Sequence, residues 1–225
     1  MPRLTQSALA ALIDHTLLKP DATRVEIEKL CHEADKYNFA SVCVQPYRAA
    51  VAAELLKNST VKVGTVIGFP LGAHRAEIKA LEAVRAVADG ALELDMVINI
   101  GAVKDKNWSL VQTEVESIVK AARERLVKVI LETALLTPQE IVKVCEISRE
   151  AGAMYVKTST GFFEHGATAE SVLLMRKTVG DDMGVKASGG IRDLETLMKM
   201  VEAGANRIGT SHGVAIMEGG GGGDY

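Results

Sequence analysis

The sequence predicts an α/β protein built as a single-domain (β/α)8 TIM barrel, and two observations carry that prediction. Eight β-prone runs alternate with helical patterns, and neighbouring runs are centred about 22 to 34 residues apart, near the roughly 30 residues that one βα unit occupies. The length of 225 residues and the 48% hydrophobic content suit one sizeable core. An open, doubly wound sheet is the alternative, but no GxGxxG motif follows the first run.

The β-prone runs and the helical patterns follow one another in strict alternation. The runs are LIDHTLL (12–18), ASVCVQP (40–46), VKVGTVIGF (61–69), LELDMVIN (92–99), VKVILET (127–133), YVKTST (155–160), GVKASGG (184–190) and RIGTS (207–211). The helical patterns repeat apolar residues at spacings of three and four, and they span residues 23–38, 47–57, 73–89, 107–125, 137–152, 167–180 and 193–205. In the third pattern, Ile78, Leu81 and Val84 mark such an apolar face.

Residues that typically start and end helices stand at these boundaries. Thr137 and Pro138 suit the cap and the first position of a helix, and Gly152 and Gly204 follow two others. We therefore assign residues 1–217 to the barrel, with an N-terminal helix. The remaining residues, 218–225, are expected to form a flexible, Gly-rich tail.

Composition excludes several classes of protein. A net charge of −3 gives no nucleic-acid footprint, and the broken apolar patch near the N-terminus predicts neither a signal peptide nor a membrane span. Three widely spaced cysteines argue against a disulfide framework or a zinc knuckle. The five histidines never occur four apart or as an HxH pair. We expect a cytoplasmic protein that needs no metal and no cofactor.

Two lysines stand in matched β-prone contexts, Lys157 in YVKTSTGFF and Lys186 in GVKASGGIR. Side chains alternate between the lumen and the helices along a barrel strand, so an inward Lys157 takes Tyr155 and Ser159 inward with it. The same alternation places Asp95 of ELDMV in the lumen. The sixth and seventh strands are neighbours, about 5 Å apart, and the two ammonium groups are expected to lie close together.

The expected closeness of the two lysines predicts that one of their amines is reactive. Two cations in a partly desolvated barrel mouth do not both stay protonated cheaply, so one amine is driven toward neutrality near pH 7. A neutral lysine attacks carbonyl groups and forms Schiff bases, and Asp95 is placed to move protons directly or through a water. Lys157, Lys186 and Asp95 thus suit carbon–carbon bond cleavage beside a carbonyl. The competing interpretation of either lysine alone is a surface residue whose head reaches solvent.

Glycines gather where the last three strands end. Gly161 follows the sixth strand, Gly189 and Gly190 end the seventh, and Ser211 stands at the end of the eighth. Loops in this part of a barrel commonly bind phosphate through backbone N–H groups. We expect these four residues to form a phosphate site, although each glycine alone also suits a simple turn.

Seven segments together resemble the deoxyribose-phosphate aldolase family: IDHTLLKPDAT, VCVQP, IGFPLG, ELDMVIN, VKTSTGF, VKASGGIR and RIGTS. The resemblance runs over residues 14–211 and implies a metal-free class I aldolase of (β/α)8 fold. Its implied reaction is the reversible cleavage of 2-deoxy-D-ribose 5-phosphate to acetaldehyde and D-glyceraldehyde 3-phosphate in deoxynucleoside breakdown.

The resemblance also implies roles for single residues. It makes Lys157 the Schiff-base lysine, Lys186 the lysine that perturbs it and moves protons, and Asp95 the proton donor and acceptor. Cys43 of VCVQP matches a lumen cysteine of the family, and packing explains it adequately. Where many members carry two adjacent serines, this chain has Ser211 followed by a histidine.

Alternatives to this function remain open at the level of sequence. One is another lysine-dependent sugar-phosphate aldolase or a transaldolase, and the other is a non-catalytic phosphate-binding barrel. The expected partners are small sugar phosphates and aldehydes, with no nucleic acid and no membrane. We also expect a homo-oligomer, a dimer or a tetramer, with the helical face of residues 47–56 as one candidate contact.

Overall fold

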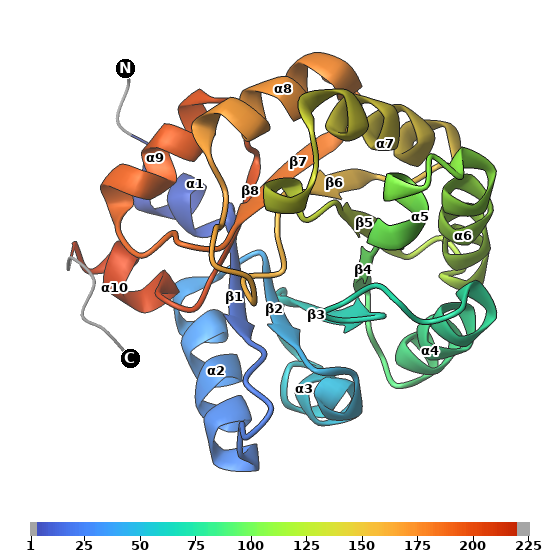
Figure 1. Cartoon of the computed structure of the whole chain (residues 1–225). Coiled ribbons are helices and arrows are strands. Elements are labelled where there is room, and N and C mark those ends of the chain that lie inside the picture. Colours follow the sequence, from blue (N-terminus) through green and yellow to red (C-terminus); the bar gives the residue numbers. More distant parts are fainter. Residues whose placement is uncertain (1–3, 220–225) are drawn as a thin grey trace.

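The computed structural model describes residues 4–219, and it is a closed, all-parallel barrel with strand order β1-β2-β3-β4-β5-β6-β7-β8. Figure 1 looks into the ring of strands and shows the helices around its outside. The strands are β1 Ile13–Leu17, β2 Ser41–Val44, β3 Lys62–Ile67, β4 Glu93–Val97, β5 Leu126–Ile130, β6 Tyr155–Lys157, β7 Gly184–Ser188 and β8 Arg207–Thr210. Every run expected to be β-prone overlaps one of them, and only β5 begins outside its run, one residue early, so the predicted barrel is confirmed and the open sheet is excluded.

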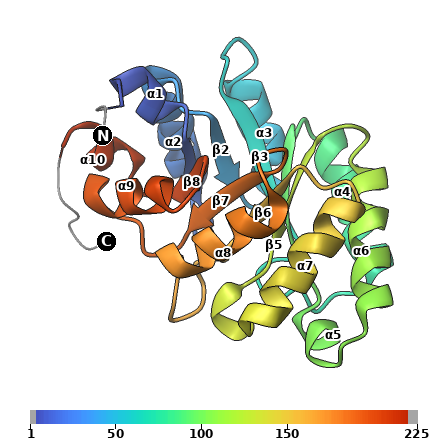
Figure 2. The ribbon, with the colours of Figure 1, turned by 90° about the horizontal axis from the view of Figure 1, so that it is seen from above.

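The helices occupy the predicted intervals and add a few short elements. They are α1 Gln6–Ala10, α2 Arg24–Tyr37, α3 Ala49–Leu55, α4 Ala76–Ala88, α5 Ile100–Lys104, α6 Trp108–Ala121, α7 Pro138–Glu150, α8 Ala169–Val179, α9 Leu194–Glu202 and α10 Gly213–Met217. Two 3-10 turns, η1 Pro46–Arg48 and η2 Thr133–Leu135, precede α3 and α7. Figure 2 shows α1 on the same side of the barrel as α10, and the two helices are in contact. The segment 220–225 of the predicted tail lies outside the described residues.

Local sequence signals start the longer helices, as predicted for Thr137 and Pro138. Thr23 and Glu26 form a reciprocal capping box at the start of α2, and Thr137 and Glu140 do the same at α7, with Pro138 in its first turn. Each box satisfies backbone N–H groups that a helix start leaves without partners. None of the helices in residues 4–219 combines the length and apolar character that a bilayer crossing requires.

The hydrophobic core lies between the barrel and its helices rather than inside the barrel. Outward-pointing strand residues such as Val42, Leu94, Val129, Val156 and Val185 are buried against apolar helix side chains. This arrangement leaves the inward positions of the strands free to carry polar groups. The alternation expected along each strand is therefore what separates an apolar outer core from a charged lumen.

Helix α4 does not bury the apolar residues that mark its face in the sequence. The three- and four-residue spacing is present, but Ile78, Leu81 and Val84 are 51%, 64% and 42% exposed. Its buried face instead carries Lys79, whose Nζ donates to Glu114 Oε1 of α6 at 2.7 Å and to the Val97 carbonyl at 2.7 Å. Apolar spacing defines a face of a helix without stating which face is buried, and here a buried ion pair decides.

We predict that Glu114→Ala lowers the free energy of unfolding by about 3–5 kcal/mol, the usual cost of stranding one charge of a buried pair. Burial raises the pKa of Glu114 and lowers that of Lys79, so desolvation already outweighs their attraction. Denaturant unfolding measures the change. The double variant Lys79→Met/Glu114→Gln, which keeps an acceptor for the Asn99 N–H, should recover part of the loss. A cost below about 1 kcal/mol for Glu114→Ala would contradict this account.

Candidate active site

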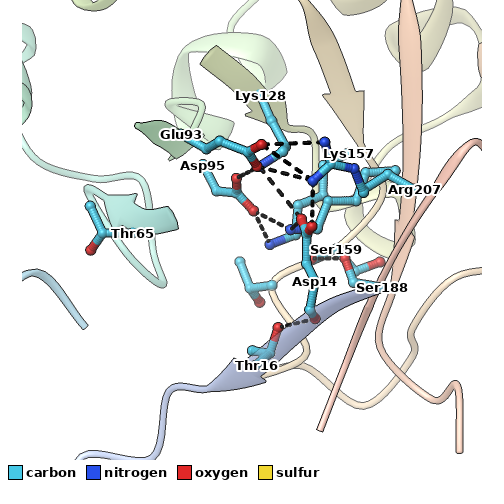
Figure 3. A network of polar contacts seen from close by, with 12 residues as sticks. Asp14, Thr16, Thr65, Glu93, Asp95, Lys128, Lys157, Ser159, Ser188 and Arg207 are labelled. Atoms are coloured by element: carbon cyan, nitrogen blue, oxygen red, sulfur yellow. Dashed lines mark hydrogen bonds and ion pairs between the residues drawn. The ribbon is translucent and has the colours of Figure 1, made fainter. Parts of the chain in front are cut away.

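One carboxylate at the centre of the lumen holds three lysines (Figure 3). Asp95 of β4 accepts through Oδ2 from Lys157 Nζ at 2.9 Å and from Lys186 Nζ at 2.7 Å. Its other oxygen, Oδ1, accepts from Lys128 Nζ at 2.8 Å. All four side chains are buried. The structure thus brings the three residues predicted to be catalytic into direct contact, and it adds a third lysine that the motifs did not single out.

A second set of charges lies beside this centre. Asp14 of β1 contacts Lys186 at 2.5 Å and Arg207 of β8 at 2.6 Å. Glu93 of β4 contacts Lys128 at 2.6 Å and Arg207 at 3.1 Å. Every basic group in the network therefore faces at least one carboxylate, as buried ion pairs require.

The local sequence explains why these side chains converge. Lys157 and Lys186 are register partners on adjacent strands, so both point to the lumen at the same height. Gly184, also a lumen position, makes room for an aromatic ring: a Cβ there would lie 2.1 Å from Tyr155 Cε1. The Arg207 guanidinium lies 5.6 Å from the centroid of that ring, so Tyr155 and Arg207 fill the lumen beside the charges.

Counting charges shows which amine is the surplus one. The network contains four basic groups, Lys128, Lys157, Lys186 and Arg207, and three carboxylates, Asp14, Glu93 and Asp95. Loss of one proton balances them. Of the four basic groups, Lys157 is held by a single carboxylate, and it is the one closest to the open end of the lumen because it lines the cavity described below.

Electrostatics agree with that assignment. Burial, assisted by the positive charge of Lys186, lowers the pKa of Lys157 in spite of the opposing pull of Asp95. Burial also works against charge on Lys186, but Asp14 and Asp95 outweigh it and raise its pKa. Burial disfavours charge on Asp95 as well, yet the three lysines hold its pKa well below the ordinary value. The sequence predicted repulsion between two lysines as the main cause, whereas desolvation is the larger one.

Three members of this network were missed as site residues. Asp14 and Arg207 lie in the motifs IDHTLL and RIGTS, and Lys128 lies in VKVIL, a lysine within a β-prone run just like the other two. That likeness was an available signal for Lys128. Glu93 stands two residues before Asp95, so the alternation that places Asp95 in the lumen places Glu93 there too, but it was assigned no role. Nothing in the one-dimensional pattern states that these strands bring their polar residues to one point.

A cavity of about 390 Å³ opens above the lysine cluster. Its lining includes Lys157 and all four residues predicted to bind phosphate, Gly161, Gly189, Gly190 and Ser211. The three glycines have φ angles of 82°, 85° and 78°, a left-handed conformation that favours glycine. Within residues 4–219, none of the four backbone N–H groups donates to another part of the chain. The cavity therefore pairs one amine with a group of unpaired N–H donors, which is a suitable environment for an anion.

The rim of the cavity also includes His212. Its Nδ1 lies 3.1 Å from Ser211 Oγ, and its backbone N–H donates to Thr210 Oγ1 at 3.0 Å. His212 thus lies at the start of α10, directly after Ser211 and beside the proposed phosphate site. Within residues 4–219, no cluster of three or more His, Cys, Asp or Glu side chains is arranged to hold a metal ion.

Cys43 packs in a small apolar cluster at the lumen. Its neighbours there are Leu18, Val66 and the partly buried Phe69. Burial raises the pKa of its thiol above the ordinary value, which disfavours the reactive thiolate. This environment agrees with a packing role for Cys43.

Comparison with known proteins places the sequence and the barrel in one family. Residues 8–219 match the model of the DeoC/LacD family aldolases. The chain belongs to this family. A relative from Lysinibacillus sphaericus named deoxyribose-phosphate aldolase is 61% identical over 211 residues, which cover 93% of this chain and 95% of the relative.

Solved structures resemble this aldolase closely. A putative deoxyribose-phosphate aldolase from Coccidioides immitis has a TM-score of 0.93 and 44% identity, covering 97% of this chain and 87% of that one. The deoxyribose phosphate aldolase from Aeropyrum pernix, described as having a unique tetrameric structure, has a TM-score of 0.89 and 38% identity. That match covers 95% of this chain and 91% of the other.

We predict that Lys157 of this aldolase reacts with a small aldehyde at lower pH than an exposed lysine such as Lys177. A lowered pKa leaves more neutral amine at any given pH, so its reaction profile rises earlier. Reductive labelling with acetaldehyde across a pH series, read by peptide mass spectrometry, measures both residues in one sample. Lys186→Met should move the Lys157 profile upward only in part, because burial remains. Coincident profiles for Lys157 and Lys177 in the native protein would refute the assignment.

Proposed function

We propose that this chain is a class I aldolase that reversibly cleaves 2-deoxy-D-ribose 5-phosphate to acetaldehyde and D-glyceraldehyde 3-phosphate through a Schiff base on Lys157. The observation that carries the proposal is a buried amine of lowered pKa beneath a cavity rimmed with unpaired N–H groups. The reaction belongs to the breakdown of deoxyribonucleosides and carbohydrates, and we propose that it takes place in the cytoplasm.

The first half of the reaction forms an electron sink. Neutral Lys157 attacks the C1 aldehyde of the open-chain sugar, and loss of water from the carbinolamine gives an iminium. Lys186 keeps its proton because Asp14 and Asp95 hold it. It is therefore the acid near the reacting centre, and it supplies positive charge close to Lys157.

The second half breaks the carbon–carbon bond. A base removes the proton of the C3 hydroxyl, the C2–C3 bond electrons move into the iminium, and D-glyceraldehyde 3-phosphate leaves. Protonation of the remaining enamine at C2 and hydrolysis then release acetaldehyde and free Lys157. Asp95 contacts both lysines, and its low pKa means that it relays a proton through Lys186 or a water rather than retaining one.

The phosphate positions the sugar for these steps. We assign it to the N–H groups of Gly161, Gly189, Gly190 and Ser211 at the rim of the cavity. Binding energy obtained far from the reacting carbons then holds C1 beside the amine of Lys157. A transaldolase or an aldolase for longer sugar phosphates would use the same amine but release a different product. Assays for acetaldehyde and for dihydroxyacetone phosphate distinguish these possibilities.

Borohydride reduction in the presence of acetaldehyde is expected to attach an ethyl group to Lys157, located by peptide mass spectrometry. Lys157→Met should abolish both the adduct and the release of acetaldehyde from 2-deoxyribose 5-phosphate, because no other lysine replaces its position. Asp95→Asn should still form some adduct but lose most cleavage. A protein that folds normally yet gives no adduct on Lys157 would favour a non-catalytic phosphate-binding barrel.

We also propose that the chain assembles as a homo-oligomer. The Aeropyrum pernix relative is described as tetrameric, and this chain exposes apolar side chains on neighbouring helices. Leu81 of α4 is 64% exposed, Leu55 of α3 is 43% exposed, and Tyr47 of η1, just before α3, is 64% exposed. Figure 1 shows α3 and α4 next to each other around the barrel.

Light scattering after gel filtration should show a dimer or a tetramer for the native chain. Leu81→Lys or Tyr47→Lys should reduce the mass, because a buried charge opposes association. Leu173→Lys, at an exposed apolar position of α8 that is remote from α3 and α4, is the matched control and should leave the mass unchanged. A native mass equal to one chain would remove this proposal.

A further inference from the structure

A buried glutamate outside the lysine network stands out at the end of β5. Glu132 is fully buried. Its Oε2 accepts two hydrogen bonds from Thr160, one from the backbone N–H at 3.0 Å and one from Oγ1 at 2.5 Å. The other oxygen, Oε1, is buried and has no partner within the described residues. Burying the Oε1 atom of Glu132 without a hydrogen-bond partner costs free energy, so the presence of a glutamate at this position needs an explanation.

The backbone of Glu132 is unusual as well. Its φ and ψ of 56° and 64° are left-handed, a conformation that costs a non-glycine residue about 1–3 kcal/mol. The bonds on either side hold it there: Leu131 N–H donates to the Lys157 carbonyl at 2.9 Å, and Thr133 N–H donates to the Thr158 carbonyl at 2.9 Å. The strained residue is therefore clamped between two bonds to β6 and its extension, the segment that carries the Schiff-base lysine.

The partner of Glu132 forms part of the cavity. Thr160, Gly161 and Phe162 all line it, and Thr160 Oγ1 also accepts from the Phe162 N–H at 3.1 Å. Next to them, Gly161 lies close to the seventh strand: a Cβ on Gly161 would be 3.9 Å from Gly189 Cα. A continuous chain of contacts thus leads from Glu132 through Thr160 to the glycines at the rim.

We propose that Glu132 is a positioning residue for the phosphate end of the site. By fixing the backbone and hydroxyl of Thr160, it sets where the N–H of Gly161 lies relative to those of Gly189 and Gly190. This arrangement gives the enzyme its preference for a phosphorylated sugar over the same sugar without phosphate. The inference rests on the proposed function and assigns a residue that takes no part in the bond-breaking steps.

The surroundings of Glu132 agree with this role. Burial raises the pKa of its carboxyl, opposed by the hydrogen bonds from Thr160 and by the charge of Lys157. The environment thus does not favour a charged group, and what the loop needs from Glu132 is an acceptor of the right shape. Glutamine offers the same acceptor without charge, whereas alanine offers none.

The test compares 2-deoxyribose 5-phosphate with unphosphorylated 2-deoxyribose as substrates, using the ratio of their kcat/KM values. Glu132→Ala and Thr160→Val should each lower this ratio about tenfold, mainly through a higher KM for the phosphorylated sugar, as expected for the loss of one or two hydrogen bonds. The double variant should be little worse than Glu132→Ala alone, because Glu132→Ala already removes the hydroxyl bond that Thr160→Val removes. Glu132→Gln should recover most of the ratio lost in Glu132→Ala.

Controls separate positioning from general stability. Val144→Ala removes packing from buried α7 without touching the loop, and it should leave the ratio unchanged. Adduct formation between Lys157 and acetaldehyde, which has no phosphate, should persist in every variant. If Glu132→Ala does not fold, Thr160→Val tests the same bond from the other side.

The outcomes distinguish failure of the positioning role of Glu132 from failure of the proposed aldolase function. An equal loss of kcat/KM for both sugars in Glu132→Ala and Thr160→Val would show a purely structural role and overturn the inference, while native cleavage and adduct formation would leave the proposed function intact. A strictly additive double variant would also overturn it. If the native protein neither cleaves the sugar phosphate nor forms the adduct, the failure belongs to the proposed function instead.

Discussion

The lumen depends on one buried carboxylate, because Asp95 is the only contact that Lys157, Lys186 and Lys128 share within the described residues. Three ammonium groups at one point of a protein interior would repel each other strongly. Asp95, with Asp14 and Glu93 behind it, makes their approach possible and leaves one positive charge in excess. The basic group with the fewest carboxylate partners is Lys157, which lines the cavity and contacts Asp95 alone among these carboxylates.

The barrel can tolerate this concentration of charge because its stability depends mainly on another layer. Apolar burial lies in the layer between strands and helices, where Val42, Leu94 and Val156 pack, so the lumen is not needed as the main core. Strand alternation then brings one polar side chain from each of several strands to the same height. Each charge in the network except that of Lys157 is shared by at least two partners, so we expect replacement of one member to affect the others.

In the proposed function, the protein binds the two ends of the sugar phosphate by different physical means. At the reacting end, side chains with altered pKa values supply an amine and an acid. At the phosphate end, backbone N–H groups in left-handed glycine turns supply donors that carry no charge of their own. Backbone donors are only as well placed as the loops that carry them, and the buried contact between Glu132 and Thr160 gives one of these loops a rigid support.

Much of this protein was determined by sequence alone. Periodicity gave eight strands and their helices, and alternation put Lys157, Lys186 and Asp95 in one lumen, because both patterns are local consequences of backbone geometry. Tertiary structure decided the rest. The buried face of α4 depends on contacts that only the folded chain makes. The same holds for the opposite pKa shifts of Lys157 and Lys186, and for the positions of Lys128, Asp14 and Arg207 in the cluster, because these residues come from strands far apart in the chain. Glu132 shows the same limit, since its partner lies 28 residues away and only the closed barrel brings the two together.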